Sequence, residues 1–247
     1  GPIKTVVNKN TETIKLKPKK SISNKQAPLT ALDKAKSTCT DLGSATGADR
    51  PELYLDFDLG TPFAERDTLP RTSQQPLSLN HKKNTYVGVH TFTSTGTHRI
   101  SMEDPNRNAG ILNIWPGGNS DDIVFALESF LIISPVLGAS GGNSSVQFTE
   151  CPCPAVGCVN TSYCYNPMGY DPDGDSLSYE LVIPLGTGAL PLILGNFYVF
   201  PDAVGGGNLN IDPINGTVCW NNPMLVGEYN FTIKIFINIR LKICFFT

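Results

Sequence analysis

The chain has 247 residues, of which 40% are apolar and 17% charged, with 23 Gly and 19 Pro; this is a globular, turn-rich composition that argues against a helical fold. The formal net charge is −3, but residues 1–38 contain nine Lys and two acidic residues, so the remainder is strongly acidic. An acidic body argues against nucleic acid as the partner of the folded part, and no stretch approaches the roughly 20 apolar residues of a membrane span.

The first segment in chain order is a lysine-rich head, residues 1–38, which includes the run KLKPKKSISNK. It has no aromatic residue and no apolar periodicity, which is typical of a disordered arm. Such an arm could contact anionic lipid or polysaccharide, whereas a solvated tail is the more common outcome for this composition. The sequence therefore predicts a disordered basic arm over residues 1–38.

Short strand-like segments make up most of the remaining chain. Each is rich in β-branched and aromatic residues and is bounded by Gly, Pro, Asn or Asp. The segments cover residues 52–59, 84–92, 97–103, 109–115, 122–133, 177–183, 196–200, 207–212, 216–220 and 227–237. No periodic segment of helical length separates them, so we expect antiparallel sheets and an all-β fold.

The best internal boundary is the segment SPVLGASGGNSS at residues 134–145, which is small, polar and rich in Gly. It divides the folded part into two blocks of about 100 residues, the size of an immunoglobulin-like sandwich. We therefore expect two tandem immunoglobulin-like β-sandwich domains, residues 39–136 and 137–247, preceded by the disordered basic arm.

The run YDPDGDSLSYEL places three carboxylates in five residues, followed by a strand-like segment; they are Asp171, Asp173 and Asp175. Alternate spacing around a flexible Gly offers side-chain oxygens to one centre, and calcium accepts 6–8 such hard ligands. The pattern does not match an EF-hand, and the absence of a nearby His disfavours a transition metal. A solvated acidic turn is the alternative. Because three carboxylates within about 6 Å raise one another's pKa unless a cation offsets them, the run predicts a calcium site.

Longer motifs of the chain occur together in one known group of proteins. The second block reads GYDPDGDSLSYELVIPLG and then LNIDPINGTVCWNNPMLVGEYNFTIKI, and the first contains ADRPELYLDFDLGTP, KNTYVGVHTF and GTHRISMEDPNRNAGILNI. Over residues 48–237 the chain resembles a PKD-like domain followed by a cadherin-like or immunoglobulin-like repeat, as found in the secreted surface proteins associated with gliding motility in Bacteroidetes. The resemblance implies a cell-surface module.

The resemblance also implies that the aspartates of the DPDGD loop bind calcium at a domain edge. The run MEDPNRN in the first block adds four oxygen donors directly after a strand, namely Glu103, Asp104, Asn106 and Asn108. We expect Glu103 or Asp104 to complete a calcium site at the domain junction. A polar loop without any ligand is the alternative.

Two departures from the resemblance affect the expected fold. The turn LDFDLGT places Asp58 and Leu59 where the PKD-like pattern has Gly-Asp. After Arg240 the sequence LKICFFT replaces the expected continuation. The second domain is therefore expected to lack its last strand, which would leave an exposed sheet edge.

Four of the seven cysteines fall within fourteen residues, in the run CPCPAVGCVNTSYC; they are Cys151, Cys153, Cys158 and Cys164. The C-x2-C pairs of zinc ribbons are absent, so one or two disulfides within this run are expected rather than a zinc site. Cys219 alternates within a strand-like segment and is expected in the core. The connectivity cannot be deduced from the sequence.

The sequence contains no H-E-x-x-H motif and no phosphate-binding glycine motif, so we expect a protein that is not an enzyme. The favoured function is a secreted or cell-surface module for adhesion or spacing, stiffened by calcium. Its partner would be an extracellular protein or polysaccharide, next to neighbouring domains of a longer chain. The alternative is a carbohydrate-binding module that accompanies a secreted hydrolase and uses exposed aromatic residues, with candidates Trp115, Trp220, Tyr163, Tyr165 and Tyr170; of these, Trp220 resembles a core residue.

Overall fold

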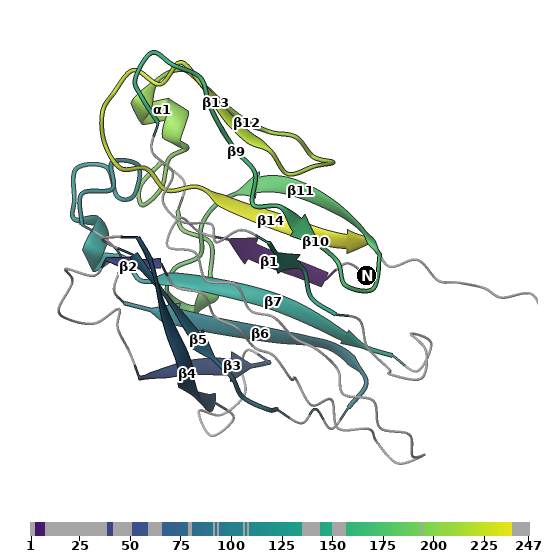
Figure 1. The fold of residues 1–247 in the computed structure, drawn as a ribbon. Coiled ribbons are helices and arrows are strands. Elements are labelled where there is room, and N and C mark those ends of the chain that lie inside the picture. The colour runs from purple at the N-terminus through teal and green to yellow at the C-terminus, as the bar shows by residue number, and fades with distance from the viewer. Residues whose placement is uncertain are drawn as a thin grey trace, which may run out of the picture.

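The computed structural model describes residues 3–7, 39–41, 51–58, 66–78, 81–90, 92, 94–105, 107, 109–134, 144–149, 157–193 and 195–238. Most of the regular structure in this part is β-strand, and every pair of strands is antiparallel (Figure 1). The helices are short: α1 (Pro201–Gly205) and two 3-10 turns, η2 (Ser120–Asp122) and η4 (Thr187–Ala189). The prediction of an all-β, antiparallel fold is confirmed, and the arrangement is sandwich-like.

The largest sheet has nine strands in the order β11-β14-β1-β7-β6-β3-β4-β5-β2. Their bounds are β1 (Ile3–Val7), β2 (Cys39–Asp41), β3 (Glu52–Phe57), β4 (Arg66–Ser78), β5 (His81–Tyr86), β6 (Gly96–Asp104), β7 (Phe125–Ile133), β11 (Ser176–Val182) and β14 (Thr232–Asn238). The pair β6–β7 is registered over nine residues, from Gly96↔Ile133 to Asp104↔Phe125.

Two smaller sheets complete the second block. β8 (Gln147–Phe148) pairs with β10 (Gly169–Tyr170), and β12 (Asn208–Ile211), β13 (Val218–Asn221) and β9 (Tyr163–Tyr165) form a three-stranded sheet in the order β12-β13-β9. The three-stranded sheet lies at the top of the molecule beside α1 (Figure 1).

Alternation of buried and exposed side chains along the strands builds two main clusters of buried apolar residues. The first contains Leu53, Leu55, Phe57, Leu69, Tyr86, Phe92, Ile100, Met102, Phe125, Leu127, Leu131 and Ile133. The second contains Val146, Phe148, Tyr179, Val218, Ile233, Ile235 and Ile237. Two smaller clusters join residues from both sides of 134–145, because Ile111 and Ile114 pack with Tyr198, and Ala126 packs with Leu185 and Ala189.

The N-terminal segment differs from the sequence-based expectation of a disordered arm over residues 1–38. Residues 3–7 form β1, which pairs with all five residues from Ile233 to Ile237 of β14 and meets β7 at Thr5↔Ser129. Four of these five residues are β-branched, which favours a strand, but the lysine-rich composition of the whole head obscured this local preference. β14 thus has neighbours on both sides; residues 8–38 and 239–247 lie outside the described part.

In the part of the chain that the structure describes, no helix is long and apolar enough to cross a membrane.

Candidate functional site

The acidic loop connects the end of β10 at Tyr170 with the start of β11 at Ser176. Asp171 organises it: its Oδ1 accepts hydrogen bonds from the backbone N–H groups of Asp173 (2.8 Å) and Asp175 (3.2 Å). Gly174 has φ +82°, and its N–H donates to the Asp171 carbonyl at 3.1 Å. An Asp that bonds its own following backbone and a Gly with positive φ are the residues that such a tight turn requires.

The second oxygen of Asp171 is the unusual feature of this loop. Asp171 is 9% exposed, and its Oδ2 is buried without a hydrogen-bond partner. Loss of hydration raises the pKa of this carboxyl, and the neighbouring Asp173 and Asp175 add to the rise, while the two backbone hydrogen bonds oppose it. A buried, unpartnered acceptor costs about 1–3 kcal/mol, so this oxygen is a place where a proton or a cation would be stabilising.

A second Asp-Pro turn in the chain provides a direct comparison. Asp212 begins the run DPING, and its carboxylate accepts hydrogen bonds from Ile214 N (2.8 Å), Asn215 N (3.1 Å) and Asn215 Nδ2 (2.6 Å). These hydrogen bonds, of which the one from Ile214 N has the largest effect, hold the pKa of the Asp212 carboxyl below its usual value. The two turns share local chemistry, but only Asp171 combines burial with an unpartnered oxygen.

The other two loop aspartates are placed differently. The Oδ2 of Asp173 accepts a hydrogen bond from the backbone N–H of Ser144 at 2.6 Å, which ties the loop to the strand segment that leads into β8. Among the described residues, no three His, Cys, Asp or Glu side chains converge on a point where they could hold a metal ion. The three aspartates share one turn, but in this arrangement their side chains do not form a group that could hold a metal ion.

Glu103 and Asp104 lie far from this loop. In the large sheet, Ser129 of β7 and Ile235 of β14 both pair with Thr5 of β1. The two residues therefore lie at the same level along the strands. Glu103 pairs with Ala126, at the level of Val182 at the end of β11, whereas the acidic loop precedes Ser176 at its start. Six residues of strand separate these levels by on the order of 20 Å, which far exceeds a metal–ligand distance. The geometry gives no support to a shared junction site.

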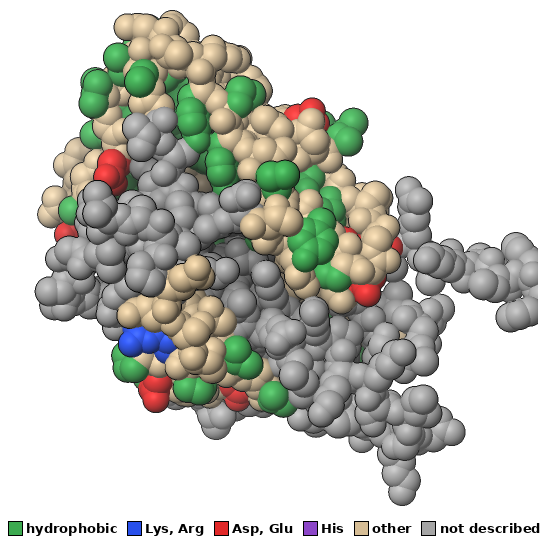
Figure 2. Space-filling view, in the orientation of Figure 1, with side chains coloured by type: hydrophobic (Ala, Val, Ile, Leu, Met, Phe, Trp, Pro, Cys, Tyr) green, Lys and Arg blue, Asp and Glu red, His purple; other side chains and the backbone are tan. Residues whose placement is uncertain are grey.

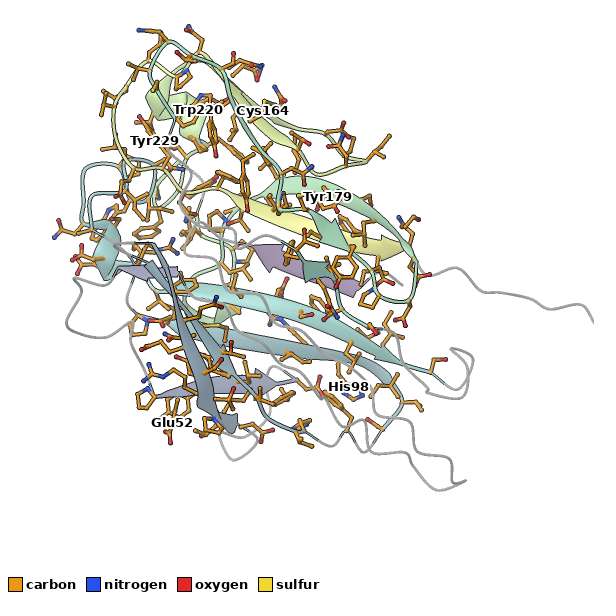
Figure 3. All side chains as sticks on the ribbon, in the orientation of Figure 1. Glu52, His98, Cys164, Tyr179, Trp220 and Tyr229 are labelled. Carbon is orange, nitrogen blue, oxygen red and sulfur yellow. A yellow bond between two sulfur atoms is a disulfide. The ribbon has the colours of Figure 1, made fainter. Side chains whose placement is uncertain are left out.

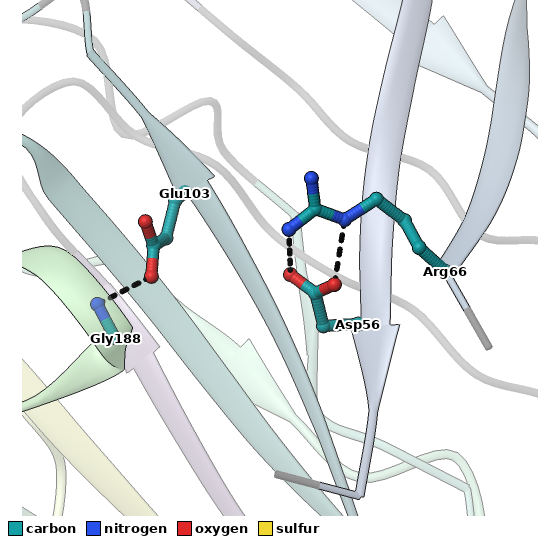
Figure 4. A network of polar contacts seen from close by, with 4 residues as sticks. All are labelled: Asp56, Arg66, Glu103 and Gly188. Atoms are coloured by element: carbon teal, nitrogen blue, oxygen red, sulfur yellow. Dashed lines mark hydrogen bonds and ion pairs between the residues drawn. The ribbon is translucent and has the colours of Figure 1, made fainter. Parts of the chain in front are cut away.

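Glu103 instead holds η4 against the sheet. Its Oε1 accepts a hydrogen bond from Gly188 N at 2.5 Å, beside the bidentate pair in which Arg66 donates to Asp56 at 2.6 and 3.0 Å (Figure 4). Asp104 is 6% exposed at the end of β6. Asn106 and Asn108, the other donors of this run, lie outside the described residues.

The one disulfide in the described part joins Cys164 of β9 to Cys219 of β13 (Figure 3). The two residues are directly opposite in the antiparallel register, with Cα atoms 4.1 Å apart, and 55 positions apart in the sequence. The expected pairing within the cysteine run is therefore wrong for Cys164, and Cys219, which was expected in the core, is half-buried and disulfide-bonded. Cys158 is free and exposed; Cys151 and Cys153 lie outside the described residues.

The aromatic residues considered for carbohydrate binding are mostly held by internal contacts. Trp220 Nε1 donates to the Gly206 carbonyl at 2.8 Å, and the Trp220 ring packs edge-on against Tyr229 (Figure 3). Trp115 packs edge-on against Phe197. Tyr170 is 45% exposed beside the acidic loop. Trp220 is only half-buried and belongs to none of the buried clusters, so it is held by internal contacts without being a core residue.

Sequence reasoning missed Asn113, which connects the two blocks. Its side chain is fully buried; Nδ2 donates to the carbonyls of Val199 (2.8 Å) and Asn230 (2.7 Å), and Oδ1 accepts from Asn230 N (2.8 Å). No sequence signal could have identified it, because both partners lie more than 80 positions away.

Asp58 and His98 form a second group that the sequence did not reveal. Asp58 has φ +52° and so takes the left-handed conformation, which favours Gly and which Asp adopts more readily than most residues. Its carboxylate contacts His98 Nδ1 at 2.8 Å and accepts a hydrogen bond from Arg99 N at 2.9 Å. His98 Nε2 lies 3.0 Å from the Ser94 carbonyl, so both ring nitrogens of this buried side chain are engaged structurally.

Comparison of the chain with known protein families, with curated proteins and with solved structures gave no match in any of the three.

Proposed function

We propose that the chain is a non-enzymatic extracellular or cell-surface module for adhesion or spacing, built as two tandem immunoglobulin-like sandwiches, whose DPDGD loop binds calcium. The antiparallel all-β fold and the Cys164–Cys219 disulfide support this proposal, since disulfides persist in oxidising compartments. The resemblance to PKD-like and cadherin-like repeats supports it independently. The partner is an extracellular protein or polysaccharide.

The observation that carries the calcium proposal is the buried, unpartnered Oδ2 of Asp171. A cation at this oxygen would supply its missing interaction and would offset the repulsion among three neighbouring carboxylates. Calcium suits such a place because it tolerates irregular sets of carboxylate, carbonyl and water oxygens. Asp173 would become a calcium ligand by giving up the hydrogen bond that its Oδ2 accepts from Ser144 N. Calcium binding would therefore be coupled to the position of the 144–149 segment.

Thermal unfolding in calcium and in chelator tests this proposal. At a calcium concentration a hundredfold above Kd we expect a stabilisation of about 2.7 kcal/mol, which corresponds to a rise in Tm of about 5–10 °C for a protein of this size. The double variant Asp173→Asn/Asp175→Asn is expected to abolish the rise.

Asp212→Asn is the matched control for this experiment, because it neutralises an aspartate in a turn of the same type whose oxygens are already partnered. It should retain the full calcium response. Identical unfolding curves in calcium and chelator for the natural sequence would reduce the DPDGD loop to a solvated turn and remove the calcium part of the proposal.

The pH dependence of stability provides a second prediction. Burial raises the pKa of Asp171 in the folded state above its value in the unfolded chain, so in chelator the folded state binds a proton more readily. The free energy of unfolding, compared with that of Asp171→Asn, should therefore rise as pH falls through this raised pKa toward the unfolded value. Calcium needs the ionised carboxylate, so the calcium-induced stabilisation should grow with pH over the same window. Urea unfolding across the acidic pH range measures both slopes, and slopes equal to those of Asp171→Asn would contradict the assignment.

A further inference from the structure

A cluster of exposed apolar side chains lies at one end of the molecule, on the connection between β13 and β14. Met224, Leu225 and Val226 are 62%, 47% and 79% exposed, and Val159 from the segment before β9 is 37% exposed. The two segments touch, since Asn160 N donates to the Pro223 carbonyl at 2.7 Å. We call these four residues the apolar tip. In Figure 2, hydrophobic side chains are scattered over the upper half of the molecule, which includes the region where α1 and its adjoining loops lie in Figure 1.

The backbone beneath the apolar tip is held by several hydrogen bonds. The N–H groups of Met224 and Leu225 both donate to the Gly205 carbonyl, at 2.7 and 3.2 Å, and the Tyr229 hydroxyl donates to the Leu225 carbonyl at 2.8 Å. Gly227 packs so closely against Leu112 that a Cβ there would lie 2.3 Å from Leu112 Cδ1. The loop therefore presents its side chains from a fixed frame, which lowers the entropy lost on binding.

Most of the packing at this end of the molecule comes from residues outside the apolar tip. The packing of this end depends on Trp220, Tyr229 and the close approach of Gly205 to both. The Met224 side chain lies against Gly206, beside that cluster, yet Met224 as a whole is 62% exposed, and Val226 is 79% exposed. Single exposed apolar residues are ordinary, but three consecutive ones with a fourth from a neighbouring segment form a contiguous patch of the kind that marks an interaction site.

The charges around the tip restrict the partner. Between Arg107 and Lys234 the sequence contains no Lys or Arg, while this stretch holds eleven Asp and Glu. Glu228 follows the tip after Gly227, and its backbone carbonyl accepts a hydrogen bond from Leu112 N. Asp121 and Asp122 belong to η2, which is bonded to the neighbouring Ile111 through Ser120 Oγ. The basic side chains visible in Figure 2 lie in the lower half of the molecule, away from the tip.

We infer that the apolar tip is a docking site for a partner protein segment that combines apolar and cationic side chains. The apolar groups would cover Met224, Leu225 and Val226, and the cationic groups would meet Glu228 and the acidic surface of this stretch of the chain. An anionic lipid surface does not fit this site, because the same carboxylates would repel it. This inference is independent of the calcium proposal, since the tip and the DPDGD loop share no residue.

The test measures binding of three labelled nine-residue peptides to the full chain: alternating Lys and Leu, alternating Glu and Leu, and alternating Lys and Ser. Only the Lys-Leu peptide is expected to bind, with an affinity that falls as salt is raised. The variant Met224→Ser/Leu225→Ser/Val226→Ser should weaken binding by more than about tenfold, because the apolar area buried on binding is lost. Glu228→Gln should reduce the salt dependence.

Ile214→Ser is the matched control, because Ile214 is 81% exposed on a different turn and should leave binding unchanged. Circular dichroism and urea unfolding verify that each variant keeps its fold. Equal binding of the Lys-Leu peptide to the triple variant, or equal binding of the Glu-Leu peptide to the natural sequence, would overturn the inference. Tip-dependent binding to phosphatidylcholine vesicles without peptide binding would assign the surface to lipid and overturn it as well.

Discussion

Replacing both Cys164 and Cys219 by Ser is expected to lower the free energy of unfolding by about 4 kcal/mol. The disulfide closes a loop with a sequence separation of 55 residues. In the chain-entropy description, a cross-link that closes a loop of this length restricts the unfolded ensemble and so stabilises the folded state by about 4 kcal/mol. β9 has only three residues and pairs with β13 along one side only, so little else fixes it to the three-stranded sheet. Urea unfolding under non-reducing conditions measures the loss.

Cys158→Ser is the control for this double variant, since Cys158 is free and exposed and its removal should change stability by less than about 0.5 kcal/mol. Addition of a reductant to the natural sequence should reproduce the loss seen in the double variant. Peptide mapping that finds Cys164 joined to a partner other than Cys219 would refute the pairing.

Replacing Asn113 by Asp is expected to destabilise the protein by about 3 kcal/mol or more, although the two side chains have nearly the same shape. The Asn113 amide donates two hydrogen bonds to the carbonyls of Val199 and Asn230 in a fully buried site. In the Asp variant a carboxylate oxygen would face these two carbonyl oxygens, and the buried charge would keep only the hydrogen bond from Asn230 N. Chemical unfolding of the variant measures the cost, which should decrease at low pH where the introduced carboxyl is protonated.

Asn166→Asp is the matched control, because the Asn166 side chain makes the same number of hydrogen bonds in a more exposed place. Its Nδ2 donates to Asn215 O (3.0 Å) and Thr217 Oγ1 (2.8 Å), and its Oδ1 accepts from Met168 N (2.7 Å). Water can replace lost partners there, so we expect a cost below about 1 kcal/mol. Equal losses at positions 113 and 166 would show that Asn113 does not join the two blocks in the way its contacts indicate.

Most strands could be predicted because their signal is local. The segments 97–103 and 177–183 correspond to β6 and β11 within one residue at each end, and the ambiguous run 122–133 is strand β7 from Phe125 onward. The segments 109–115 and 196–200 have strand-like composition, but they make only isolated bridges, such as Ile114↔Tyr198. Their hydrogen bonds go to loops, as those of Asn113 do, and that choice depends on neighbours distant in sequence.

β4 is a strand that the sequence did not predict. Its sequence RDTLPRTSQQPLS contains two Pro and few β-branched residues, so no strand was expected, yet it is the longest strand in the described part. It forms because β3 and β5 flank it on both sides, with register shifts near Arg71/Ser73 and Pro76/Ser78. Tertiary pairing therefore outweighed local propensity in this segment.

The sequence alone determined the class of the fold and the turn at Asp171, because both arise from interactions among residues a few positions apart: alternation along strands, and an Asp side chain that bonds its own following backbone. The tertiary structure decided which cysteines bond, where Glu103 lies and how Asn113 joins the two blocks. Each of these depends on strand register and loop packing between segments about 50 or more positions apart, and many alternative pairings of such segments satisfy the same local preferences. Only the cooperative packing of the whole chain selects among them.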